Sequence, residues 1–206
     1  MLKKIILFLI LSLFINLTYS NICGEADVAF YSGSITDSTI QFKTVLGRDR
    51  YLITRFDRKE WGTWNIGGWY IEDNNTKTLL AGGGTDWEYV FRVASNSNGG
   101  AAFSGGNHGN EKLISLKTYN GDTNEELDFA NIKDTKMIKI VEITELLFHN
   151  SQNPYARVKR EYSVYPKSIT LNTHFDFIED AYFNLSYVCM FPVEKTFSKN
   201  FKYMES

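Results

Sequence analysis

The stretch Ile169-Thr-Leu-Asn-Thr-His-Phe-Asp-Phe177 alternates between two kinds of residue. Its odd positions are mainly apolar, whereas its even positions hold Thr170, Asn172, His174 and Asp176. Successive side chains of a β-strand point to opposite faces, so this alternation predicts a strand with one packed face and one polar face. The polar face is either an ordinary solvent-facing surface or the floor of a binding cleft.

Runs of the same kind recur along the chain, separated by clusters of Gly, Asn and Asp. Runs rich in Val, Ile, Thr, Tyr and Phe between such clusters are typical of strands and turns. The many short strands favour an all-β fold, an antiparallel β-sandwich of the jelly-roll type, with helix confined to a turn or two in residues 123–131. Asn120-Gly121 gives the clearest hairpin signal. The predicted strands are residues 27–32, 39–46, 50–57, 60–73, 77–81, 86–94, 112–119, 136–148, 155–165, 169–178 and 182–191.

The chain begins with Lys3 and Lys4, then an almost unbroken apolar stretch from Ile5 to Leu17, then small residues that suit cleavage before Asn21. This order is typical of a secretory signal peptide. We therefore predict a signal peptide at residues 1–20 and a single β-sandwich domain at residues 21–206. The protein would be secreted, extracellular or periplasmic, with no stable membrane anchor after cleavage. The alternative is an uncleaved anchor, but a membrane-spanning helix takes about 20 apolar residues.

The two cysteines, Cys23 and Cys189, would both belong to the exported chain. Disulfides form and persist in oxidising compartments, so an even cysteine count in a secreted protein predicts that the two are paired.

The composition narrows the classes of partner. The formal net charge is −2, which gives no electrostatic basis for binding nucleic acid. Aromatic residues make up 15% of the chain, including twelve tyrosines and four tryptophans. Such side chains favour strands and also offer flat surfaces on which sugar rings stack. No cofactor is expected, and the sequence does not predict an oligomeric state.

The run Phe103-Ser-Gly-Gly-Asn-His-Gly-Asn-Glu111 holds one of only three histidines, His108, framed by glycines. Glycine is tolerated where the backbone needs positive φ or where another group approaches closely. An imidazole changes its charge near neutral pH, so in this setting it is a candidate for proton transfer or for contact with a ligand. Asn107 lies beside it and is a candidate for the same site.

Residues 105–111 resemble the zinc-binding run of carboxypeptidase- and aspartoacylase-type hydrolases. The resemblance implies that His108 and Glu111 are metal ligands, with His149 or His174 completing the site. On a helix the spacing of His108 and Glu111 would place both side chains on one face. The following residues, 112–119, read as a strand, where such a spacing points to opposite faces. A zinc hydrolase is therefore the third of our hypotheses.

In fold class, export and aromatic content the chain resembles the secreted jelly-roll, concanavalin A-like polysaccharide lyases. The resemblance covers architecture and residue types. It implies that one group neutralises a uronate carboxylate while a base and an acid transfer protons at the scissile unit. His108 would be the base or the acid, Tyr162 or Tyr165 the partner acid, and Arg92 or Asn107 the neutralising group. His174 is a further candidate for acid–base chemistry.

The second hypothesis is a non-catalytic carbohydrate- or surface-binding module. Trp61, Trp64, Trp69 and Tyr70 crowd a glycine-rich stretch, and Trp61 and Trp69 share strand parity. These rings either fill the sandwich or form a platform for sugars. A structural or adhesive protein without a small ligand also stays open. The predicted substrate-binding residues are Trp61, Trp69, Asn172, Arg160 and Glu111.

Glycosidase chemistry needs two carboxylates on either side of the scissile bond. Glu88, Glu111, Asp122 and Asp176 are available, but nothing in the sequence pairs any two of them. We therefore do not predict that activity.

Overall fold

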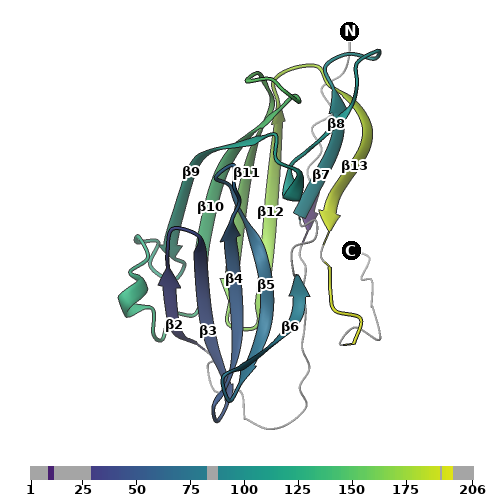
Figure 1. The fold of residues 1–206 in the computed structure, drawn as a ribbon. Helices are drawn as coiled ribbons and strands as arrows, with labels where there is room; N and C mark the ends of the chain where they lie inside the picture. The colour runs from purple at the N-terminus through teal and green to yellow at the C-terminus, as the bar shows by residue number, and fades with distance from the viewer. Residues whose placement is uncertain (1–8, 12–28, 83–87, 191, 197–206) are drawn as a thin grey trace.

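The structure, a computed structural model, describes residues 9–11, 29–82, 88–190 and 192–196 (Figure 1). It is an all-β antiparallel sandwich, and its described helices are two single 3₁₀ turns, η1 (Gly106–His108) and η2 (Phe129–Asn131). The strands are β1 (Leu9–Leu11), β2 (Phe30–Ile35), β3 (Thr39–Gly47), β4 (Arg50–Arg58), β5 (Trp64–Asp73), β6 (Thr76–Gly82), β7 (Glu88–Ala94), β8 (Ala102–Ser104), β9 (Glu111–Asn120), β10 (Ile138–Leu147), β11 (Pro154–Tyr165), β12 (Ser168–Phe177) and β13 (Tyr182–Met190).

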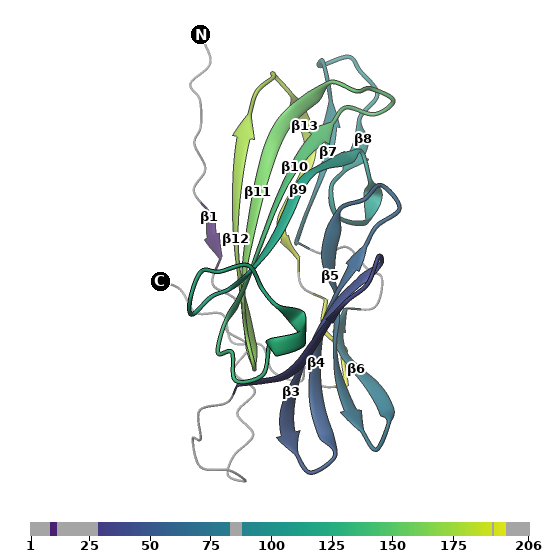
Figure 2. The ribbon, with the colours of Figure 1, turned by 90° about the vertical axis from the view of Figure 1, so that its left-hand side faces the viewer.

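The strands form three sheets in two layers. One layer is the five-stranded sheet β1-β12-β11-β10-β9. The other layer consists of the sheet β2-β3-β4-β5-β6 and, towards the other end of the molecule, the sheet β13-β7-β8 (Figure 2). Most neighbouring strands follow one another in the chain, so the two five-stranded sheets are largely meanders. The jelly-roll strand order expected from the sequence is not confirmed.

The core is divided in the same way as the second layer. One cluster, with Phe42, Phe56 and Ile138 among its members, packs the β9–β12 sheet against the β2–β6 sheet. A second cluster, with Tyr89, Phe91 and Val158, packs the same sheet against β7. Buried charged residues lie between these two clusters, where the two sheets of the second layer meet.

Strict alternation builds the central strands. Along β10, each residue from Ile138 alternates between buried and half-buried. The inward series of β10 contains Glu142 and Thr144 among isoleucine and leucine, and that of β11 contains Arg160 among Val158, Tyr162 and Val164. Charged groups therefore enter the interior at one level of the sandwich.

Every predicted strand overlaps an observed one. The alternation of residues 169–177 is confirmed, because Ile169 is buried and His174 is exposed. Three details differ. The run at residues 60–73 begins its strand only at Trp64, because a turn with φ 95° at Gly62 precedes it. β8 was not predicted. Asn120-Gly121 ends β9, but the connection to β10 is the longer loop 121–137, which contains η2.

The amino-terminal predictions fall mostly outside the described residues. Residues 9–11, within the predicted signal peptide, pair with Leu171–Thr173 of β12. Cys23 lies outside the described residues, so its pairing with Cys189 stays a prediction. In the described part of the chain, no helix has the length and apolar character needed to cross a membrane.

Candidate functional site

The loop that carries His108 has an unusual backbone. Gly105, Gly106, Gly109 and Asn110 all have positive φ. The turn is closed by a hydrogen bond from the Gly105 amide to the Gly109 carbonyl, 2.9 Å. Glycine adopts positive φ without the steric cost that other residues meet. The glycines predicted to permit such a bend are therefore needed for it.

Neighbouring strands hold this loop in place. The Asn110 carbonyl accepts hydrogen bonds from the Ser104 hydroxyl, 3.1 Å, and from the Leu147 amide, 2.8 Å. The Tyr155 hydroxyl donates in turn to Ser104 Oγ, 3.1 Å. Trp61 packs against the other side of the loop, because a Cβ atom at Gly109 would lie 3.3 Å from its ring. The loop is thus fixed by β8, β10, β11 and the turn before β5.

The exposed imidazole of His108 stacks on Phe103, with ring centroids 4.5 Å apart and planes 21° apart. The Arg92 guanidinium lies 5.9 Å from the centroid of the same ring. Arg92 and Phe103 are directly paired across β7 and β8, which places both on one face of the sheet. Phe103 therefore contacts both an imidazole and a guanidinium.

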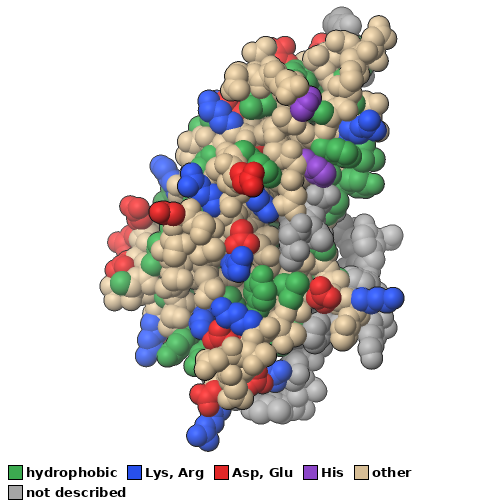
Figure 3. All heavy atoms as spheres, in the orientation of Figure 1, with side chains coloured by type: hydrophobic (Ala, Val, Ile, Leu, Met, Phe, Trp, Pro, Cys, Tyr) green, Lys and Arg blue, Asp and Glu red, His purple; other side chains and the backbone are tan. Residues whose placement is uncertain are grey.

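Two tyrosines of β13 share this face. Tyr182 pairs with Ala94 and Tyr187 pairs with Val90, and both partners have the same strand parity as Arg92. Tyr182 is 49% exposed and Tyr187 48% exposed. We call the surface formed by Arg92, Phe103, His108, Tyr182 and Tyr187 the Arg92–His108 surface. Figure 3 shows hydrophobic side chains gathered beside a histidine and a basic side chain in this region of the molecule.

A buried charge network lies inside the sandwich, next to the end of this loop. Arg160 is completely buried and pairs with three carboxylates. Its Nη1 lies 2.7 Å from Glu88, and its Nη2 lies 3.2 Å from Glu111 and 2.7 Å from Glu142. Tyr89 and Thr144 also donate hydrogen bonds to Glu111, each at 2.6 Å. Glu111, which directly follows Asn110, thus ties the His108 loop to the interior.

Three buried carboxylates face a single guanidinium. Burial therefore disfavours the ionisation of all three carboxyl groups at once. Burial raises the pKa of Glu142 to about 8, although the Arg160 charge opposes the rise and the Glu111 charge adds to it. Burial also raises the pKa of Tyr89 well above its usual range. The raised pKa favours the protonated form of Glu142, which brings the network closer to charge balance.

The network also completes the hydrogen bonding of β5. Pairing between β5 and β6 ends at Gly68, so the first residues of β5 extend beyond that partner strand. The Trp64 amide donates to Glu142 Oε1, 2.8 Å, and the Ile66 amide donates to Glu88 Oε1, 3.2 Å. Among the described residues, buried carboxylates thus accept the hydrogen bonds of these two amides, and Glu142 joins β5 to the opposite layer.

The structure brings some of the predicted site residues together and separates others. His108, Arg92 and Asn107 lie on or beside the Arg92–His108 surface, and Trp61 borders the same loop. Asn172 and His174 are exposed on the outer face of β12, and Tyr165 is exposed at the end of β11. The remaining predicted residues, Arg160, Glu111, Tyr162 and Trp69, are buried in the interior.

Among the described residues, no three His, Cys, Asp or Glu side chains are placed to hold a metal ion, so the structure does not support the zinc hypothesis. His108 is exposed on the loop, whereas Glu111 is buried against Arg160. The carboxylates Glu88 and Glu111, which the sequence did not pair, do meet at Arg160. Their side chains are 2% and 0% exposed, so in this structure they contact the protein interior and not a substrate.

Sequence reasoning missed several members of these groups. Glu142 is the clearest case, although its signal was present, since it occupies an inward position in the alternating series of β10. Phe103, Tyr182 and Tyr187 lay within runs already singled out, but their common face depends on how β7, β8 and β13 pair. Comparisons with protein-family models, curated proteins and solved structures found no match to this chain.

Proposed function

We propose that this protein is a secreted β-sandwich that binds an extracellular polysaccharide carrying uronate groups, through the Arg92–His108 surface. The observation that carries the proposal is the grouping of a guanidinium, an imidazole and three exposed aromatic rings on one face. Aromatic rings stack on the apolar faces of sugars, and a guanidinium pairs with a carboxylate through two parallel hydrogen bonds. Secretion rests on the signal-like residues at the start of the chain.

The arrangement favours binding over elimination chemistry. A lyase needs a base, an acid and a group that neutralises the carboxylate around one sugar unit. Tyr162 and Arg160 lie in the interior, and His174 lies on the outer face of β12. Of the catalytic residues suggested by the lyase resemblance, the surface gathers His108, Arg92 and Asn107.

The test is isothermal titration calorimetry with polygalacturonate and alginate at low salt. We expect Arg92→Ala and Tyr187→Ala each to weaken binding about tenfold, which corresponds to about 1.4 kcal/mol. Tyr165→Ala is the matched control, because it removes an exposed tyrosine from a different sheet. Added salt should weaken binding of the wild type, since exposed charges are screened. Absence of binding to either polymer, or equal affinities of all variants, would overturn the proposal.

A second candidate function is a polysaccharide lyase that uses His108. It is favoured by one observation, an exposed imidazole that stacks on the same ring as the Arg92 guanidinium. Incubation of the wild type with the same polyuronates should then produce unsaturated ends, detected by ultraviolet absorbance. His108→Gln should abolish product formation even at polymer concentrations that saturate binding. No product from the wild type, or undiminished product from His108→Gln, excludes this candidate.

A further inference from the structure

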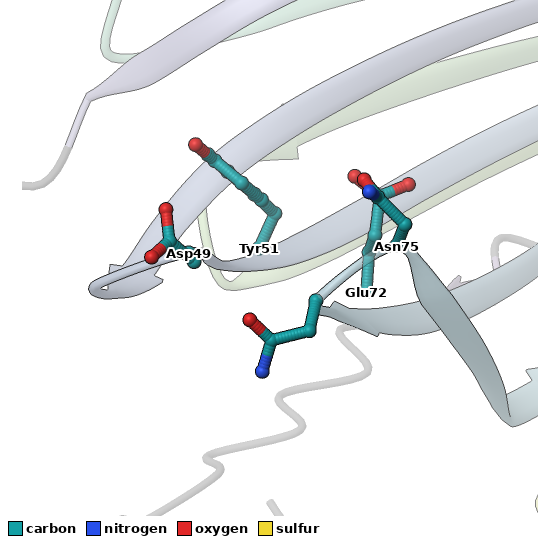
Figure 4. A pocket seen from close by; sticks show the side chains of 5 residues that line it. Asp49, Tyr51, Glu72 and Asn75 are labelled. Carbon is teal, nitrogen blue, oxygen red and sulfur yellow. The ribbon is translucent and has the colours of Figure 1, made fainter.

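A small polar pocket lies at the end of the sandwich remote from the His108 loop. It has a volume of about 220 Å³ and is lined by Asp49, Tyr51, Glu72, Asn74 and Asn75. These residues come from the β3–β4 and β5–β6 hairpins, whose turns lie at the lower end of the molecule in Figure 1. Figure 4 shows Tyr51 between Asp49 on one side and Glu72 and Asn75 on the other.

The two hairpin turns give the pocket a fixed shape. Asp49, Asn74 and Asn75 have φ angles of 54°, 47° and 65°, the left-handed conformation that tight hairpins require. The Asn74 amide donates to the Asp49 carbonyl at 3.3 Å, which ties one turn to the other. The ring of Tyr31 packs against that of Tyr51, with centroids 5.4 Å apart. The backbone of the two turns and the ring of Tyr51 are therefore held before any ligand arrives, while the side chains of Asp49, Asn74 and Asn75 are exposed.

The charges around the pocket argue against a metal ion and give no preference for an acidic ligand. Glu72 is 8% exposed, and its two oxygens lie 2.6 Å from Lys43 Nζ and 3.6 Å from Lys77 Nζ. The hydrogen bond from Lys43 lowers the pKa of this carboxyl, so it stays ionised. Lys43 and Lys77 already form ion pairs with Glu72, and their positive charges would repel a metal cation. Asp49 and Glu72 carry two negative charges and Lys43 and Lys77 two positive ones, so these four groups have no net charge and give no electrostatic preference for a uronate or phosphate.

We propose that this pocket binds one uncharged sugar residue. Sugar hydroxyls both donate and accept hydrogen bonds, which matches a carboxylate that accepts and amides that do both. Tyr51 lines the pocket with its ring packed against Tyr31 and with Lys43 Nζ 5.3 Å from the ring centroid, so it adds a partly apolar wall to these polar groups, the combination found in sites for small polar ligands. The pocket thus differs from the Arg92–His108 surface in the charge of the ligand that it takes. The inference extends the proposed role in polysaccharide binding but does not depend on the Arg92–His108 surface.

The experiment is a titration of the full chain with neutral mono- and oligosaccharides, namely glucose, galactose, mannose, xylose, N-acetylglucosamine and short oligomers of each. Binding is measured by ligand-observed NMR and by calorimetry. Asn75→Gly is the main variant, because glycine accepts the φ of 65° while removing the amide. Tyr51→Ala is the second variant. Each should weaken binding of the neutral sugar about tenfold or more, as each removes a direct contact.

The controls separate this proposal from the previous one. Arg92→Ala and Tyr165→Ala should bind the neutral sugar as the wild type does, and Asn75→Gly should bind polyuronate normally. If no neutral sugar of the panel binds, or if Asn75→Gly and Tyr51→Ala bind it unchanged, the pocket is not a sugar site. Neutral sugar binding that persists without polyuronate binding upholds the pocket while the proposed function fails.

Discussion

Gly105 shows how a single residue sets the position of His108. Its φ of 87° and ψ of 171° fall in a region that essentially only glycine occupies. A Cβ atom at this position would also lie 2.6 Å from the ring of Tyr89, which is itself buried and bonded to Glu111. The position therefore excludes any side chain for two independent reasons, one in the backbone and one in packing.

Gly105→Ala should consequently destabilise the fold by about 2–4 kcal/mol, from backbone strain together with overpacking. The free energy of unfolding in urea measures this change. Gly100→Ala is the control, because a Cβ atom at Gly100 would have no neighbour within 4 Å and the φ angle there is not positive. That control should stay within about 0.5 kcal/mol of the wild type. Equal stability of the two variants would show that the loop adapts to a side chain.

At the scale of elements, β5 depends on side chains for part of its hydrogen bonding. Its first residues have β4 on one side and the carboxylates of Glu142 and Glu88 on the other. A buried amide without an acceptor costs about 1–3 kcal/mol. The network is therefore an extension of the sheet as much as a set of ion pairs.

We expect Glu142→Ala to accelerate hydrogen exchange at the Trp64 amide, because that amide loses its acceptor at 2.8 Å. The Ile66 amide should change less, since it donates to Glu88. Exchange followed by NMR at single residues distinguishes the two. Glu145→Ala is the matched control on the same strand, because Glu145 pairs outward with Arg157. Unchanged protection of Trp64 would mean that another group accepts its hydrogen bond.

The elements themselves were largely predictable from the sequence, whereas the grouping of their side chains was not. Period-two alternation predicted β12, whereas β10 and β11 were predicted from their strand-favouring composition and the turns that bound them. Arg160 was predicted to contact a substrate and Glu142 was not singled out, although both occupy inward positions of alternating strands, and alternation does not say which residue of the opposite layer they meet. That depends on contacts distant in the chain, such as Trp64 with Glu142. The Arg92–His108 surface was predicted in part. His108 and Arg92 were chosen by residue type, whereas Tyr182 and Tyr187 lie beside them because of strand pairing that the sequence does not reveal.

At the scale of the whole molecule, the buried network lies where three sheets meet. Glu88 comes from the β13-β7-β8 sheet, Glu142, Glu111 and Arg160 from the opposite layer, and the amides of Trp64 and Ile66 from the β2–β6 sheet. Removing one member of a buried charge group leaves the others uncompensated, which is far more costly than breaking a surface pair. This cluster therefore links all three sheets, in addition to the two hydrophobic clusters that pack them together.

The stability of the protein should fall as the pH rises from about 4.5 to about 8. Burial raises the pKa of Glu142 from 4.5 to about 8, so the folded state holds a proton that the unfolded state releases at lower pH. The stabilising contribution is complete below the unfolded value and is lost as the pH passes through about 8. The loss is on the order of a few kcal/mol, and urea unfolding at a series of pH values measures it. Glu142→Gln mimics the protonated acid and keeps an oxygen that accepts the hydrogen bond of the Trp64 amide. The stability of this variant should therefore change little between pH 4.5 and about 8, and it should exceed that of the wild type at pH values above about 8. A Glu142→Gln profile that falls with pH as steeply as that of the wild type would assign the proton to another group.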